Sequence, residues 1–123
     1  MGESRKERVF ITGNYEKVKN EMKFKDIFGR EIRLSSEVWD HILKTHPELK
    51  GELERIKETL MGPEIIKRSV YASTVMLFYR YYKDLYGGKY ICVAIKILDK
   101  DCFISTSYIT DGVKRGEIVW KRD

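Results

Sequence analysis

The chain contains two histidines, His41 and His46, and both fall in one short segment. An imidazole exchanges protons near neutral pH, so histidine is well suited to general acid–base catalysis. On a helix, His46 would lie within an apolar stripe and His41 at its margin. A histidine in such a stripe can also be a hydrogen-bonded core residue, and one at the margin can be ordinary surface. The pair is therefore a candidate that other residues must support.

Three basic residues stand in segments that are otherwise apolar or aromatic: Arg68, Arg80 and Lys96. A guanidinium or ammonium group on a sheet can hold a scissile phosphate and stabilise the added charge of a phosphorane transition state. The alternative is that each side chain extends along the sheet to reach solvent. We expect Arg68 and Arg80 to bind the phosphate and Lys96 to contact RNA.

Hydroxyl groups are concentrated in the segment Ser105-Thr106-Ser107-Tyr108. Strand alternation puts Thr106 and Tyr108 on one face, where they can orient a phosphate, and the tyrosine ring can also stack on a splayed base. We expect Ser107 and the strand residue Tyr82 to add RNA contacts. Tyrosines in antiparallel sheets are also common packing residues, so this role stays open.

Two helices are expected to carry the histidines. Ser35 and Ser36 can cap the first helix, whose apolar residues continue to His46. Pro47 disfavours helical backbone at the preceding residue and predicts a bend there. A second helix with apolar positions at Leu49, Leu53, Ile56 and Leu60 should end at Gly62-Pro63.

The remaining elements are predicted to be strands. From Glu64 the apolar period changes to two, which indicates strands at residues 65–72, 75–83, 89–98 and 102–110, joined by short turns as an antiparallel meander. The apolar alternation from Ile91 to Ile97 marks the face that the helices should cover. Residues 22–34 predict a hairpin, and residues 9–11 a short strand.

These elements define an α+β fold, with an N-terminal hairpin and two helices packed on a four-stranded antiparallel sheet. A chain of 123 residues fits one domain, 1–123, with a core over about 22–120.

The composition favours an anionic partner. Lys and Arg number 24 against 19 Asp and Glu, which gives a net charge of +5. Such a charge attracts nucleic acid through counterion release. The alternative is that the excess of basic residues only keeps the protein surface solvated. The chain has no apolar run of the roughly 20 residues that cross a bilayer, so we expect no membrane contact and a cytoplasmic location. Cys92 and Cys102 are expected to be small apolar thiols, with an occasional disulfide as the alternative.

Motifs that hold cofactors or metals are missing from the sequence, which has no glycine-rich phosphate loop after a strand, no CxxC pair and no His-x-x-x-His. We therefore expect no cofactor and no metal.

Several short motifs occur in an order that resembles the phage-associated nuclease domains of the barnase, EndoU, colicin and RelE type (the BECR fold). They span residues 29–120 and comprise Trp39-Asp40-His41-Ile42, His46-Pro47-Glu48-Leu49, Gly62-Pro63-Glu64-Ile65, Tyr79-Arg80, Tyr90 to Lys96, and Phe103-Ile104-Ser105-Thr106-Ser107-Tyr108. The resemblance implies helices on a four-stranded antiparallel sheet and RNA cleavage without metal, often by a toxin or phage-borne effector. It assigns the helix histidines to His41 and His46, the strand cations to Arg68 and Arg80, and the polar pair to Thr106 and Tyr108. This sequence has Ser107 where such domains often have alanine.

The sequence thus leads to the hypothesis of a metal-independent endoribonuclease that forms a 2′,3′-cyclic phosphate. His46 first and His41 second would exchange protons, with Tyr108 as a further proton-transfer group if the other histidine is too far away. One alternative is a non-catalytic RNA-binding or interaction module, and another is an enzyme for a small anionic substrate. An inhibitory protein partner stays open.

Overall fold

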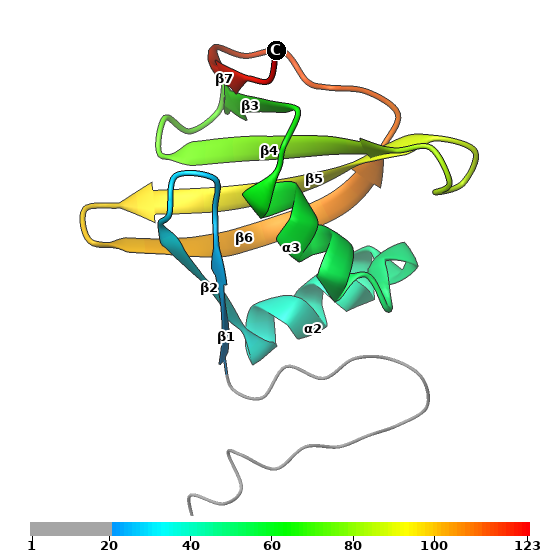
Figure 1. The fold of residues 1–123 in the computed structure, drawn as a ribbon. Coiled ribbons are helices and arrows are strands. Elements are labelled where there is room, and N and C mark those ends of the chain that lie inside the picture. The colour runs from blue at the N-terminus through cyan, green and yellow to red at the C-terminus, as the bar shows by residue number, and fades with distance from the viewer. Residues whose placement is uncertain (1–20) are drawn as a thin grey trace, which may run out of the picture.

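The computed structural model describes residues 21–123, so the strand predicted at residues 9–11 lies outside them. The elements in chain order are β1 (Glu21–Lys25), β2 (Glu31–Ser35), α2 (Ser36–Thr45), the short 3-10 helix η1 (Pro47–Leu49), α3 (Leu53–Met61), β3 (Ile65–Arg68), β4 (Val75–Tyr82), β5 (Lys89–Leu98), β6 (Asp101–Thr110) and β7 (Ile118–Lys121). The predicted α+β class is confirmed, because two helices accompany a large and mostly antiparallel sheet (Figure 1).

The hairpin predicted at residues 22–34 is confirmed as β1 and β2. The buried carboxylate of Asp26 organises its turn, because it accepts hydrogen bonds of 2.9 Å from the backbone N–H groups of Phe28 and Arg30. The Nε of Arg30 donates to the same carboxylate at 2.7 Å. Gly29 completes the turn with a φ of 83°, which glycine adopts at little steric cost.

The predicted bend at His46 separates α2 from η1. Ser35 caps α2, since its hydroxyl accepts a hydrogen bond of 3.1 Å from the backbone N–H of Val38. The helix ends just before His46, whose φ of −134° and ψ of 69° suit a residue that precedes a proline. Leu49 was expected in the second helix but lies in η1, because Pro47 starts a 3-10 turn that stops before α3.

All the strands belong to one seven-stranded sheet, in the order β1-β2-β6-β5-β4-β3-β7. The predicted antiparallel meander is confirmed as its centre, from β3 to β6. The prediction of four strands in the sheet is wrong. The hairpin does not pack on a face, because β2 joins β6 in parallel at Arg33 and Phe103. In addition, β7 pairs antiparallel with β3.

Two strands depart from the sequence prediction: β7 was not predicted, and β3 is shorter than predicted. β7 has 4 residues, which is too short for a period of two to distinguish it from a loop. β3 also has 4 residues and ends at Arg68, so the strand expected to reach residue 72 gives way to a loop over residues 69–74. That loop forms part of the candidate site.

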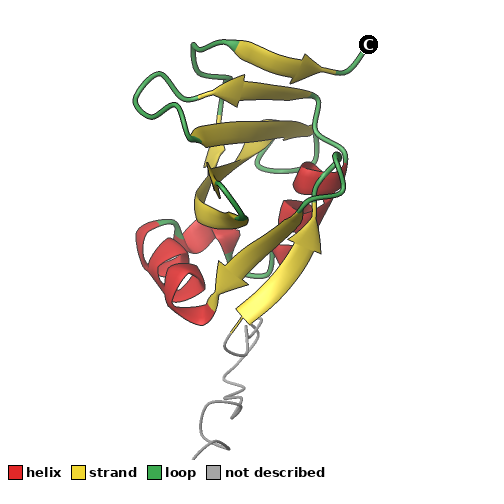
Figure 2. Cartoon of the chain, turned by 90° about the vertical axis from the view of Figure 1, so that its left-hand side faces the viewer, coloured by secondary structure: helices red, strands yellow, loops and turns green. Residues whose placement is uncertain are grey.

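The two faces of the sheet are buried in different ways. Ile91, Val93 and Ile95 of β5 belong to the main core beneath the helices, which confirms the predicted helix-covered face. In Figure 1, α3 crosses in front of β5 while α2 lies below β6, and Figure 2 shows the twist of the strands from the side. On the other side, which we call the open face, lies a smaller cluster of Leu77, Tyr79, Cys92 and Ala94.

A β-bulge at Ser105 reverses the alternation of β6. Thr106 pairs with Ala94 whereas Ile104 pairs with the next residue of β5, so Ser105 has no partner in the ladder. Its hydroxyl instead donates to the Ala94 carbonyl at 3.2 Å. Because of the extra residue, Ile104 lies in the helix-side core while Tyr108 joins the open face.

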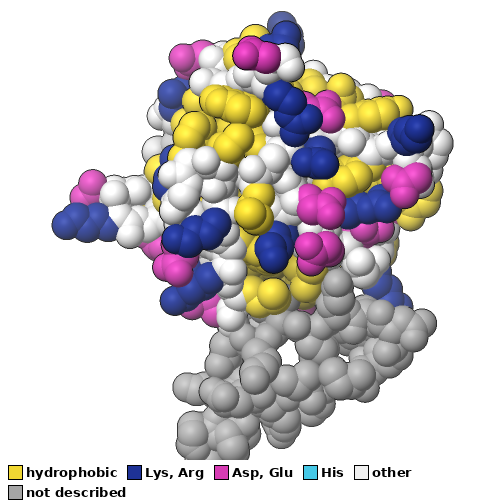
Figure 3. Space-filling model, in the orientation of Figure 1, with side chains coloured by type: hydrophobic (Ala, Val, Ile, Leu, Met, Phe, Trp, Pro, Cys, Tyr) yellow, Lys and Arg dark blue, Asp and Glu magenta, His cyan; other side chains and the backbone are white. Residues whose placement is uncertain are grey.

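The helix-covered side carries charges of both signs. In Figure 3, which has the orientation of Figure 1, acidic and basic side chains are interspersed with apolar ones. Over residues 21–123, no helix has the length and apolarity needed to cross a membrane.

Candidate functional site

His46 lies at the end of α2, beside the edge of β6. Its ring centroid is 5.8 Å from that of Tyr108, with the two planes tilted by 40°. The Nδ1 atom lies 3.6 Å from a carboxylate oxygen of Glu48, and the histidine side chain is 34% exposed. His46 is therefore neither sealed in the core nor fully in solvent, and its ring is accessible for proton exchange.

Tyr108 connects this histidine to the open face. Its ring packs against the cluster of Tyr79 and Cys92, and the Nζ of Lys114 lies 5.2 Å from the ring centroid. Burial raises the pKa of Tyr108 well above its ordinary value, and the neighbouring Cys92 and Tyr79 raise it further. Tyr108 thus stays a neutral phenol near neutral pH, better suited to stacking and hydrogen bonding than to proton transfer.

A pocket of about 360 Å³ opens on this face of the sheet. Its floor is apolar, from Val75, Leu77 and Ala94, and the bulged end of β6 adds the polar residues Ser105, Thr106 and Tyr108. Of the residues predicted as catalytic, Thr106 and Tyr108 line this pocket. His46 is not itself a lining residue but adjoins the pocket through its contact with Tyr108.

Two loops line the same pocket, one over residues 69–74 and the other over residues 111–117. The first contributes Ser69, Val70 and Tyr71, and the second contributes Lys114 and Arg115. Together they put aromatic and cationic side chains around an apolar floor.

The 111–117 loop is fixed by hydrogen bonds from neighbouring strands. The backbone N–H of Lys114 donates to the Tyr79 hydroxyl at 3.2 Å, and the Lys114 carbonyl accepts from the Nζ of Lys67 at 3.1 Å. Sequence reasoning missed Lys114 and Arg115, because they follow the last predicted strand. The only signal was a pair of basic residues between Gly112 and Gly116.

Arg68 does not line this pocket. The strand register sets it opposite Met76, a residue of the helix-side core, whereas Leu77 of the open face pairs with Lys67. The Nε of Arg68 donates to the Glu117 carboxylate at 2.9 Å, and an Nη donates to the Ser73 carbonyl at 3.0 Å. These bonds connect the two loops of the pocket, so Arg68 stabilises the loops and does not line the pocket.

Arg80 also belongs to the helix-covered side. It pairs with Ile91 of the main core, and its Nη1 donates to the Gly62 carbonyl at 2.8 Å. Arg122 donates to the same carbonyl at 2.8 Å. Because Gly62 follows the last residue of α3, the two guanidinium groups interact favourably with the carboxyl end of that helix.

His41 and Lys96 lie apart from the pocket as well. His41 is exposed on α2, and its carbonyl accepts from the Thr45 hydroxyl at 2.9 Å. Lys96 occupies the same side of β5 as Ala94, since the two are separated by one residue of the strand. It is therefore on the open face, next to the pocket but not among its lining residues.

Ser107 and Tyr82 are occupied by structural hydrogen bonds. Ser107 is buried, and its hydroxyl donates to the Cys92 carbonyl at 2.7 Å. The Tyr82 hydroxyl donates to the Glu58 carboxylate at 3.0 Å and to the Arg55 carbonyl at 3.2 Å, which anchors the ring against α3. Both hydroxyls therefore have protein partners, and neither residue lines the open-face pocket.

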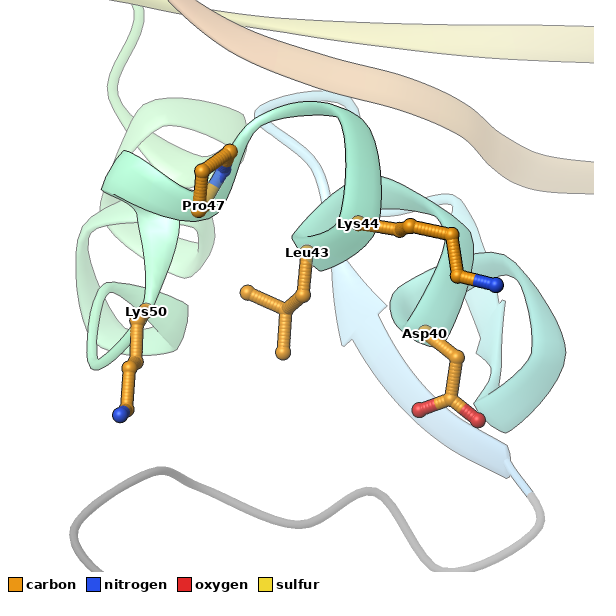
Figure 4. A pocket seen from close by; sticks show the side chains of 5 residues that line it. All are labelled: Asp40, Leu43, Lys44, Pro47 and Lys50. Atoms are coloured by element: carbon orange, nitrogen blue, oxygen red, sulfur yellow. The ribbon is translucent and has the colours of Figure 1, made fainter.

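A second pocket of about 360 Å³ lies on the outer side of α2 and η1, away from the strands. Figure 4 shows Leu43 pointing into it, with Lys50 on one side and Asp40 and Lys44 on the other. None of the residues predicted to act in catalysis lines it, so the open-face pocket is the better candidate.

Comparisons with known proteins do not assign this site, since no family model, no curated protein and no solved structure matches the chain.

Among residues 21–123, no three His, Cys, Asp or Glu side chains are grouped so that they could hold a metal ion.

Proposed function

We propose that this protein is a metal-independent endoribonuclease that works at the open-face pocket. The observation that carries the proposal is the contact between the His46 and Tyr108 rings, whose centroids are 5.8 Å apart. It joins an imidazole that is about one-third exposed to a pocket with hydroxyl and cationic walls. A general base beside a cationic site that can hold a phosphate is the minimum that this reaction requires.

In the proposed reaction, His46 takes the proton of a ribose 2′-hydroxyl. The 2′-oxygen attacks the adjacent phosphorus, the bond from phosphorus to the 5′-oxygen breaks, and that oxygen is protonated by the imidazolium or by solvent. The products are a 2′,3′-cyclic phosphate and a 5′-hydroxyl. Lys114 and Arg115 would counter the charge of the phosphorane, and Thr106 would orient the phosphate.

The finer fold assignment, a BECR-like nuclease, belongs to the same proposal. It is supported by a helical segment followed by an antiparallel meander with a pocket on the face opposite the helices. The parallel contact of β2 with β6 and the added β7 are features that the resemblance does not imply. RNA as partner, an inhibitory protein and a cytoplasmic location are further parts of the proposal.

The direct test is to incubate the purified protein with mixed RNA in the presence of chelator and to analyse the new ends. We expect cleavage with 2′,3′-cyclic phosphate ends and no cleavage of DNA. His46→Ala should reduce the rate by about 100- to 10,000-fold, the usual value of general acid–base catalysis. His41→Ala, at an exposed position of α2, is the matched control and should leave the rate within a few-fold. Intact RNA, or cleavage only with added metal, would overturn the proposal.

A second candidate is a non-catalytic RNA-binding or interaction module. It is favoured by the distance of Arg68, Arg80 and His41 from the pocket, which leaves one histidine and no second acid. His46→Ala discriminates between the two, because a binder keeps its function whereas an enzyme loses turnover and keeps its affinity. Competition by mononucleotides against oligonucleotides would reveal the third possibility, a small anionic substrate.

A further inference from the structure

An aromatic side chain in the 69–74 loop is left almost entirely in solvent. Tyr71 is 91% exposed and its neighbour Val70 is 62% exposed, yet both line the open-face pocket. An exposed apolar pair at the rim of a pocket contributes nothing to the core, and such pairs commonly mark a binding surface. The chemistry of a ligand that would use it can be argued from the surroundings.

The loop that presents Tyr71 is fixed by its own hydrogen bonds. The N–H of Ser69 donates to the Val75 carbonyl at 2.9 Å, and the N–H of Val75 donates to the Ala72 carbonyl at 3.0 Å. The N–H of Tyr71 donates to the Ser69 hydroxyl at 3.1 Å. A ring held on an ordered backbone loses little conformational entropy when a ligand stacks on it.

The other loop of the pocket supplies uncompensated positive charge. Its two carboxylates are paired, Asp111 with Lys89 at 2.7 Å and Glu117 with Arg68 at 2.9 Å. Over residues 21–123, neither Lys114 nor Arg115 forms an ion pair, and both are exposed. A flat aromatic ring and two cations without a carboxylate partner among residues 21–123 match the two parts of a nucleotide, its base and its phosphate.

We propose that Tyr71 is a stacking platform for one unstacked base of single-stranded RNA, whose adjoining phosphate lies toward Lys114 and Arg115. The inference rests on the proposed function and adds the substrate class. Bases within a duplex are already stacked on each other and paired, so a duplex cannot offer one to Tyr71. The site therefore selects unpaired segments.

The test measures binding without cleavage, by fluorescence anisotropy with two labelled probes of equal length. One is a single-stranded 2′-O-methyl oligonucleotide, which lacks the attacking hydroxyl, and the other is an abasic phosphodiester chain of tetrahydrofuran units. We expect the wild-type protein to prefer the base-bearing probe. Tyr71→Ala should lower the affinity for the base-bearing probe by about tenfold and leave the affinity for the abasic probe unchanged. Tyr71→Phe should keep the preference for the base-bearing probe.

Two sets of variants serve as controls. Tyr86→Ala removes a ring that is 64% exposed but lies outside this pocket, and it should change neither affinity. Lys114→Ala and Arg115→Ala should lower the affinity for both probes by similar factors, because phosphate contacts do not depend on the base.

Equal wild-type affinities for the two probes would overturn the inference and indicate a general polyanion site. It would likewise be overturned by an unchanged base preference in Tyr71→Ala, or by no binding of either probe. Since neither probe can be cleaved through a 2′-hydroxyl, a protein that binds as expected but leaves RNA intact would refute the ribonuclease and keep the stacking platform.

Discussion

The His46 ring contacts the Tyr108 ring although the two residues belong to opposite sides of the sheet. His46 comes from the helix side, while Tyr108 projects from the open face. The contact is formed because β2 pairs with β6 only at Phe103, which leaves the later part of β6 as an edge beside α2 and η1. A helix residue can thus reach around this edge to the open-face pocket.

Glu48 is predicted to hold the His46 ring in its working orientation. Its carboxylate lies 3.6 Å from Nδ1, and both side chains are about one-third exposed. Because a partly exposed pair of this kind contributes about 0.2–1 kcal/mol, Glu48→Gln should lower kcat for RNA by up to about fivefold and leave KM unchanged. Glu54→Gln, an exposed carboxylate of α3, is the control. An unchanged kcat, or an effect confined to KM, would contradict a positioning role.

Arg80 is predicted to stabilise the fold without contributing to catalysis. Arg80→Met removes a hydrogen bond to the Gly62 carbonyl, so the free energy of unfolding in urea should fall by about 1 kcal/mol. The folded variant should cleave RNA at the wild-type rate. Lys114→Met should show the reverse pattern, with stability kept and activity lost. If folded Arg80→Met were inactive, the assignment of Arg80 to the phosphate would be restored.

Gly116 is predicted to control the position of the cationic loop. It has a φ of 150°, and a β-carbon there would lie 2.4 Å from the backbone oxygen of Arg68. Gly116→Ala should therefore displace the loop, costing about 1–3 kcal/mol of stability and weakening RNA binding through Lys114. Gly112→Ala is the matched change in the same loop, since its β-carbon would meet nothing within 4 Å. Equal effects of the two substitutions on unfolding and binding would refute this account.

Stability is predicted to fall at alkaline pH because of Cys92. Burial raises the pKa of this thiol from 9.0 to about 11. The folded state therefore favours the protonated thiol. Its contribution to stability is complete below pH 9 and is lost as the pH rises through the folded pKa, on the order of 2 kcal/mol in all. Urea unfolding of wild type and Cys92→Ala between about pH 8 and pH 11 measures this loss. We expect the free energy of unfolding of Cys92→Ala to fall less steeply with pH than that of the wild type. If the two proteins lost stability in parallel, Cys92 would be ruled out as the source of the loss.

The sequence by itself determined the local elements and the most important candidate residue. The apolar period and Pro47 were enough to predict that α2 ends at His46. The alternation of apolar residues was enough to predict β5 and its helix-covered face. Both signals depend only on near neighbours in the chain. Alternation also put Thr106 and Tyr108 on a common face. The α+β class followed from the same patterns.

Only the tertiary structure decided which charged groups line the pocket beside Tyr108. Arg68 and Arg80 interrupt apolar strands as a phosphate site would, but the register turns them to the helix side, where they pair with Glu117 and Gly62. Lys114 reaches Tyr108 because its loop folds back and bonds to Tyr79. Strand register, β-bulges and the positions of loops depend on contacts between residues far apart in the chain. The local periodicity of the sequence does not predict such contacts.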